Sequence, residues 1–170
     1  ADQFTGGDGT FNGNLDEIVV VVSGVAGGSG STVEVDFDQF SFTSGGPLAV
    51  PTQIVDDFEN GLPSGVDGNG IPIGFNTFSD GSPVSIAITN TPPSPVPGAA
   101  AGNNVLALTG NVAAFAGFTH SFENDAVDTW VPQDWSKFEG LSFWLYGQNS
   151  GTGLFVDILD NRNPGSTTDD

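Results

Sequence analysis

Short alternating segments separated by glycine and proline restrict this chain to an all-β fold. Its 170 residues include 25 glycines and 11 prolines, and these fall between segments only five to ten residues long. No segment keeps a helical hydrophobic period with capping residues at its ends. This punctuation is typical of many short strands joined by turns. We therefore predict an all-β, antiparallel β-sandwich, jelly-roll-like in its arrangement.

Nine segments carry strand signals and one carries a loop signal. The predicted strands are residues 18–22, 33–42, 54–59, 74–78, 84–89, 104–109, 113–122, 141–146 and 154–159. Strands 18–22 and 33–42, joined by a glycine-rich loop, predict a hairpin. Strict alternation along 33–42 places Phe37 and Gln39 on one face and Asp38 and Phe40 on the other. Residues 91–98 contain four prolines and predict a stiff surface loop.

The charge balance excludes several classes of partner. Lys137 and Arg162 are the only basic residues against 21 acidic ones, giving a net charge of −19. Nucleic acids and anionic membrane surfaces need clustered lysine or arginine, so neither is expected as a partner. No apolar run approaches the roughly 18 residues of a membrane-spanning helix, so membrane insertion is not expected. No basic segment precedes an apolar stretch, so we expect any signal peptide to have been removed.

Residues 134–147 hold the strongest functional signal. A polar turn containing Trp135 leads into a strand with large apolar residues on both faces. Leu141, Phe143 and Leu145 alternate with Ser142, Trp144 and Tyr146. One face can serve the core, while Trp144 and Tyr146 on the other either pack in a second core or contact a ligand.

This pattern resembles the non-catalytic β-sandwich carbohydrate-binding modules of secreted polysaccharide-degrading enzymes. Such modules carry an early strand similar to 56–59 (Asp-Asp-Phe-Glu), then the aromatic strand, then a strand ending like 157–162. A closing hairpin similar to 15–22 plus 33–42 comes last in those modules, whereas here it comes first. The resemblance implies an extracellular or cell-surface protein that binds a polysaccharide or another glycan.

The unusual order divides the chain into three segments and leaves three explanations open. Residues 1–45 are the N-terminal hairpin segment, 46–53 a linker, and 54–170 the main sandwich. The chain is a circular permutant, or a cut across two tandem modules, or a subunit whose hairpin completes a neighbour's sandwich. In the last case, unpaired sheet edges accept a strand from the next copy, and self-association builds a head-to-tail filament or array.

Planar aromatic rings stack on the apolar faces of pyranose rings, and polar side chains bind the hydroxyl groups. The last strand contributes Asp157, Asp160 and Arg162, and we expect it to lie beside the aromatic strand. The predicted carbohydrate-binding residues are Trp144, Tyr146, Trp130, Asp157, Asp160 and Arg162. The alternatives are an ion pair of Arg162 with one of the two aspartates and burial of the aromatic rings in the core.

Two groups of closely spaced acids form a candidate metal site. They are Asp36 and Asp38 on one strand and Asp56, Asp57 and Glu59 on another. Calcium takes six to eight oxygen ligands, mostly from carboxylates and carbonyls. Modules of the resembling family often hold a structural calcium where the first and last strands meet, so the resemblance implies a calcium site here. The alternative is that these acids are solvated on exposed faces.

Nothing in the sequence supports catalysis. The chain has no cysteine, a single histidine (His120) and no phosphate-binding loop, and no Ser-His-Asp arrangement stands in a recognisable context. Paired carboxylates can hydrolyse glycosides, but no pair is distinguished among the 21 acids. We therefore predict a binding module and not an enzyme.

Overall fold

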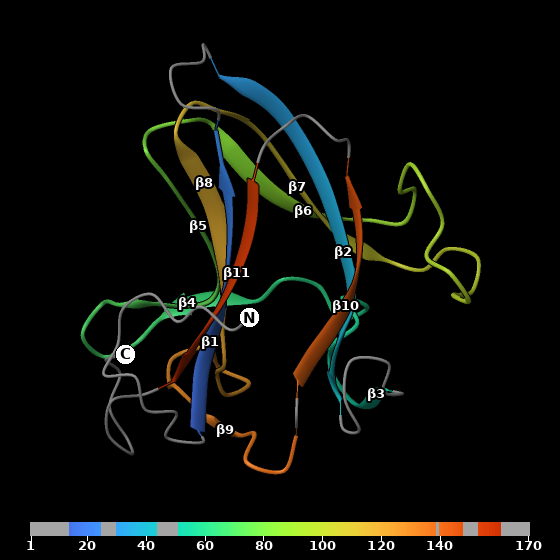
Figure 1. Ribbon diagram of the computed structural model, residues 1–170. Helices are drawn as coiled ribbons and strands as arrows, with labels where there is room; N and C mark the ends of the chain where they lie inside the picture. Colours follow the sequence, from blue (N-terminus) through green and yellow to red (C-terminus); the bar gives the residue numbers. More distant parts are fainter. Residues whose placement is uncertain (1–13, 25–29, 44–50, 139, 148–152, 161–170) are drawn as a thin grey trace.

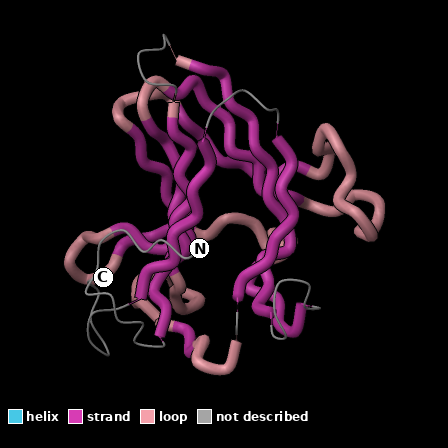
Figure 2. The backbone as a smooth tube through the Cα atoms, in the orientation of Figure 1, coloured by secondary structure: helices cyan, strands magenta, loops and turns pink. Residues whose placement is uncertain are grey.

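Two antiparallel sheets face each other in a β-sandwich, as predicted. The computed structural model describes residues 14–24, 30–43, 51–138, 140–147 and 153–160, and these contain strands and loops without a helix (Figures 1 and 2). Accordingly, none of these residues forms a helix that could cross a membrane.

The first sheet, here called sheet A, has the strand order β11-β1-β8-β5-β4, with β9 beside one end of β1. Its strands are β1 (Asn14–Ser23), β4 (Ser64–Val66), β5 (Pro72–Ser79), β8 (Phe115–Ser121), β9 (Gln133–Asp134) and β11 (Gly153–Asp160). The second, sheet B, has the order β10-β2-β7-β6, with β3 beside β2. Its strands are β2 (Ser31–Thr43), β3 (Pro51–Asp56), β6 (Val84–Thr89), β7 (Val105–Val112) and β10 (Gly140–Gly147).

The N-terminal strand pair is not the predicted hairpin. β1 lies between β8 and β11 in sheet A, whereas β2 lies between β7 and β10 in sheet B, so the two strands do not pair with each other. We call residues 14–43 the N-terminal arch, because its two strands, β1 and β2, belong to different sheets (Figure 1). β10 and β11 are likewise in different sheets. Alternation along a strand reveals its two faces but not the sheet that it joins.

The core between the sheets is built largely from phenylalanine. Phe37 of β2 packs edge-on against Phe118 of β8, with ring centroids 5.5 Å apart, and so joins the two sheets. Phe40 of β2 packs against Phe143 of β10 at 5.1 Å. β1 contributes three buried hydrophobic residues among those described, Ile18, Val20 and Val22. The N-terminal arch therefore supplies core residues to both sheets.

A bulge at Gln39 resets the alternation of β2. Asp38 pairs with Trp144 and Ser41 pairs with Ser142, so two residues of β2 oppose one residue of β10. Gln39 has a φ of 53°, in the left-handed region. As a result Phe40 is fully buried on the same side as Phe37. The prediction that Phe40 shares a face with Asp38 is therefore wrong.

Most predicted strands lie within two residues of the observed ones, with one clear displacement. The strand predicted at 54–59 is β3, which ends at Asp56. Beyond it the Asp56 carboxylate accepts a hydrogen bond from the N–H of Phe58 at 2.6 Å, and Phe58 has a φ of 60°. This turn ends the strand and directs the Phe58 ring into the core, where it is fully buried.

Candidate functional site

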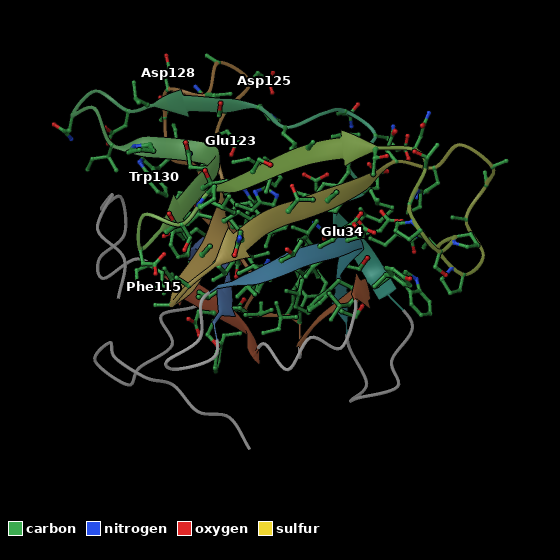
Figure 3. All side chains as sticks on the ribbon, turned by 90° about the horizontal axis from the view of Figure 1, so that it is seen from above. Glu34, Phe115, Glu123, Asp125, Asp128 and Trp130 are labelled. Atoms are coloured by element: carbon green, nitrogen blue, oxygen red, sulfur yellow. The ribbon has the colours of Figure 1, made fainter. Side chains whose placement is uncertain are left out.

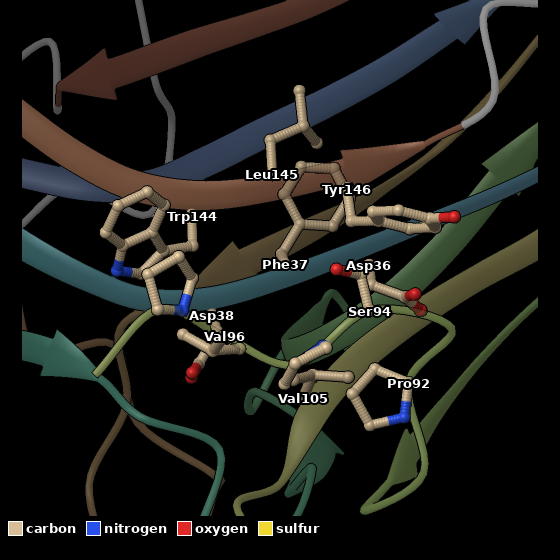
Figure 4. Close-up of a pocket in the computed structure, with 12 residues that line it drawn as sticks. Asp36, Phe37, Asp38, Pro92, Ser94, Val96, Val105, Trp144, Leu145 and Tyr146 are labelled. Carbon is tan, nitrogen blue, oxygen red and sulfur yellow. The ribbon is translucent and has the colours of Figure 1, made fainter. Parts of the chain in front are cut away.

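An open cleft lies on the outer face of sheet B, over β2 and β10. Its floor comes from cross-strand pairs: Trp144 opposite Asp38, and Tyr146 opposite Asp36. The proline-rich loop between β6 and β7 forms the facing wall (Figure 4). The lining residues of this loop are Pro92, Ser94, Pro95, Val96 and Pro97. The volume is about 210 Å³, below the roughly 300–1,000 Å³ of enclosing small-molecule pockets. Such a cleft suits a ligand that extends across the protein surface better than a small ligand that must be enclosed.

Trp144 and Tyr146 are available for contact. Their exposed fractions are 46% and 39%, so they do not form a second core. Leu141 and Phe143, on the opposite face of β10, pack against the core. Leu145, which pairs with buried Phe37, is 47% exposed because β10 is the edge strand of sheet B. The edge position therefore presents three large side chains to one open cleft.

Asp38 is buried and held in place by hydrogen bonds. One carboxylate oxygen accepts the N–H of Gln39 at 2.8 Å, and the other accepts the side-chain amide of Asn103 at 2.8 Å. Burial raises the pKa of Asp38, while these two hydrogen bonds act in the opposite direction. The bulge at Gln39 thus has a local role, because it directs an N–H to the Asp38 carboxylate.

Asp36 lines the same cleft but, unlike Asp38, has no hydrogen bonds to its carboxylate among the described residues. It is 4% exposed. Burial raises the pKa of Asp36, and the charge of Glu34 raises it further. A buried acceptor without a donor costs roughly 1–3 kcal/mol. Hydroxyl groups of a ligand that reached Asp36 would offset that cost.

The structure does not bring the remaining predicted sugar-binding residues to this cleft. Asp157 is exposed on β11, which is a strand of sheet A and not the neighbour of β10 that we expected. Trp130 is partly buried and pairs through an isolated bridge with Glu123. Figure 3 shows Trp130 and Glu123 well away from Glu34, a β2 residue close to Asp36. Asp160 lies at the end of β11 and its side chain is not described, and Arg162 lies outside the described residues.

The five predicted metal ligands do not form one site. Asp36 faces the cleft, and Asp56 lies 3.3 Å from the Nε2 atom of His120. Glu59 accepts hydrogen bonds from the backbone and side-chain N–H groups of Asn104, both at 2.8 Å. Asp57 accepts the N–H of Glu59 at 3.2 Å. In the described part of the chain, no three acidic or histidine side chains are arranged to hold a metal ion.

Asp57 and Glu59 nevertheless act on Asp38 through their charges. The charges of Glu59 and Asp57 contribute, after burial, to the raised pKa of Asp38. Three of the five acids are thus near enough for two of them to act on the third. The predicted metal site stays a prediction, and Asp36 and Asp38 line the cleft.

Sequence reasoning missed the wall of the cleft. It recognised residues 91–98 as a stiff loop but assigned no contact to it. The signal that could have found it is the position of the loop, which directly precedes β7, and β7 pairs with β2. That signal becomes usable only once the strand order of sheet B is known.

Comparison with known proteins identifies the family. Residues 43–169 match the family model described as Carbohydrate binding domain (family 11). A search of curated proteins and a search of solved structures found no match. The match covers most of the chain and includes β10 and the proline-rich loop, while nearly all of the N-terminal arch precedes it. The chain therefore belongs to carbohydrate-binding family 11.

Proposed function

We propose that the protein is a non-catalytic, extracellular module that binds a polysaccharide chain in the cleft over β2 and β10. The observation that supports this proposal is the pair of exposed rings, Trp144 and Tyr146, set opposite the buried carboxylates of Asp38 and Asp36. A sugar ligand offers both apolar ring faces and hydroxyl donors. The cleft offers the complementary surfaces side by side.

Each part of the cleft has a separate task in this mechanism. Trp144 and Tyr146 stack on sugar rings and bury apolar area with little loss of side-chain freedom, because each has only two rotatable χ angles. Asp36 accepts hydroxyl hydrogen bonds, which are stronger to a charged acceptor, at about 1.5–3 kcal/mol each. Asp38, already fixed by Asn103, holds its side of the floor rigid. The proline-rich loop limits the ligand on the other side.

The first experiment compares Trp144→Ala and Tyr146→Ala with the unmodified chain by isothermal titration against soluble polysaccharides of different linkage. Loss of one stacking ring should weaken binding about tenfold or more, corresponding to roughly 1.4 kcal/mol. Phe155→Ala is the matched control, because Phe155 is an aromatic residue 55% exposed on sheet A, outside the cleft. Equal loss in all three variants would contradict the proposed cleft.

The absence of catalysis is tested on the same preparations. Incubation of the bound polysaccharide with a large amount of protein should release no new reducing ends. Release that is lost in a carboxylate variant of the cleft, such as Asp36→Asn, would show an enzyme instead.

We also propose calcium as a structural ion in the region of Asp38, Asp57 and Glu59. Carboxylate oxygens are the ligands that Ca²⁺ prefers, and the charges of Glu59 and Asp57 already act against the charged form of Asp38 here. The existing hydrogen bonds of Glu59 to Asn104 would have to rearrange for an ion to bind.

A further inference from the structure

The N-terminal arch holds the two sheets together. β1 pairs with β8, β9 and β11, and β2 pairs with β3, β7 and β10. β10 and β11 have no other strand partner in the described ranges. Without the arch, the last two strands have no sheet to join. The remainder keeps only β8-β5-β4 from one sheet and β7-β6 from the other.

The buried contacts of the arch also connect it to strands of both sheets. Phe37 contacts Phe118 of β8 and Phe143 of β10, with ring centroids 5.5 and 6.0 Å apart. On the other strand, Glu17 accepts a buried hydrogen bond from Ser121 of β8 at 2.7 Å. A strand that is central in each sheet and buried on its inner face cannot be left out. Some copy of the arch must fill this position.

The contacts of the arch do not depend on which chain carries it. The family match begins at residue 43, at the end of β2, so the matched region contains neither β1 nor nearly any of β2. In sheet A, β1 lies between β8 and β11, two strands that follow it late in the sequence. Until it enters, the position is open to the arch of any copy, and exchange of an identical element is a low-cost route to assembly.

The cleft is incomplete without the arch. Asp36 and Asp38 belong to the arch, whereas Trp144, Tyr146 and the proline-rich loop belong to the matched region. We propose that residues 14–43 are exchanged between copies of this chain, so that the arch of one copy completes the sandwich and the cleft of another. Each cleft then combines the carboxylates of one chain with the aromatic rings of the next.

Disulfide trapping tests the exchange, since the chain has no cysteine of its own. Val19 and Thr119 are directly opposite on β1 and β8. Opposite residues of antiparallel strands have Cα atoms about 4.5–5.5 Å apart, within disulfide range. The full-length Val19→Cys/Thr119→Cys variant is oxidised and separated on a denaturing, non-reducing gel. Exchange gives covalent dimers or longer products, and these would support the proposal.

The control pair shares one of the two positions. Asn76 lies opposite Thr119 on the other side, in β5, and both residues belong to the matched region. Asn76→Cys/Thr119→Cys should therefore close within one chain and run at the monomer mass of 17.4 kDa. If Val19→Cys/Thr119→Cys also runs only as a monomer after its thiols are consumed, the proposal is overturned.

A second pair in sheet B guards against poor folding or slow oxidation of the first. Thr32 of β2 lies opposite Asn111 of β7, and both side chains are exposed. Thr32→Cys/Asn111→Cys is compared with Ser85→Cys/Thr109→Cys, whose native hydroxyls are 3.0 Å apart within the matched region. If thiols stay free in both arch pairs, light scattering of the unmodified chain decides. A mass of 17.4 kDa at every concentration overturns the exchange, and a multiple of it supports the exchange.

These readouts are independent of sugar binding. Failure of the titrations with Trp144→Ala and Tyr146→Ala would overturn the proposed function and leave the gel result intact. The converse holds for a monomeric chain that still binds its polysaccharide.

Discussion

Glu123 shares one partly buried region with Asp56 and His120. Its Oε2 atom has no hydrogen-bond partner among the described residues. Burial raises the pKa of Glu123, the charge of His120 lowers it, and the charge of Asp56 raises it. His120, stacked on the Phe75 ring at 4.2 Å, is fixed on its other side. The net result is a carboxylate that is less stable when charged in the folded protein than in the unfolded chain.

We predict that Glu123→Gln stabilises the protein at neutral pH. Because the pKa of Glu123 is higher in the folded state, the folded protein binds more protons between the two pKa values. The charged form therefore destabilises the fold at pH 7, and this penalty disappears as the pH falls toward the unfolded value of 4.5. We expect a gain on the order of 1 kcal/mol at pH 7 and none near pH 4, measured by thermal unfolding.

Asp125→Asn serves as the comparison, since Asp125 is exposed two residues later. It removes the same charge from the chain without removing a buried carboxylate, and should change the melting temperature little. A Glu123→Gln variant that is less stable than the unmodified protein at pH 7 would show that the charge itself is needed.

Gln39 marks the point in β2 where prediction of side-chain direction from strict alternation fails. The alternation of β2 was read correctly from Val33 to Asp38 and then failed at Phe40. A left-handed φ at a glutamine carries no sequence signature comparable to that of glycine. The burial of Phe40 depends on that one backbone angle, so strict alternation could not find it.

At the scale of elements, the proline-rich loop forms one wall of the cleft, and we expect that its cleft-lining side chains can be changed without destabilising the fold. Pro92 and Val96 line the cleft, whereas Pro93 lies in the same loop, is exposed and does not line the cleft. We predict that Pro92→Ala with Val96→Ala weakens polysaccharide binding by roughly three- to tenfold, or about 0.6–1.4 kcal/mol of lost contact. The melting temperature should change little.

The measurement is isothermal titration beside a thermal melt of each variant. Pro93→Ala should bind like the unmodified chain. If Pro93→Ala weakens binding as much as the double variant, stiffness of the whole loop matters more than the wall contacts.

The elements also show what the pattern of hydrophobic residues can predict. Strand existence followed from alternation and turn residues. Alternation also placed Trp144 and Tyr146 on one face of β10 but left open whether that face was buried, and the structure exposes both side chains. The sheet to which each strand belongs could not be predicted, because β1 pairs with strands that begin 92 or more residues after it ends (115 − 23). β2 likewise pairs with the distant β7 and β10 as well as with the nearby β3. Asp157 was assigned to the cleft for that reason, although β11 lies in the other sheet.

At the scale of the whole molecule, a net charge of −19 with two basic residues makes stability sensitive to cations. Any salt screens the mutual repulsion. A specific ion adds stabilisation that grows with the ratio of its concentration to its dissociation constant. We therefore predict that CaCl₂ raises the melting temperature more than NaCl at matched ionic strength.

The combined variant Asp57→Asn with Glu59→Gln should remove the difference between the two salts while keeping the general effect of NaCl. Equal melting curves of the unmodified chain in both salts would end the calcium proposal and leave screening as the explanation.

The central position of the arch has a consequence for synthesis. β1 leaves the ribosome before all of its strand partners, and the earliest of them in chain order, β8, begins 92 residues after β1 ends (115 − 23). At about 5–20 residues per second, this interval is roughly 5–20 s. Sheet A therefore cannot form progressively from the N-terminus. β1 stays without a strand partner until β8 has been translated, so the sandwich forms only after that point.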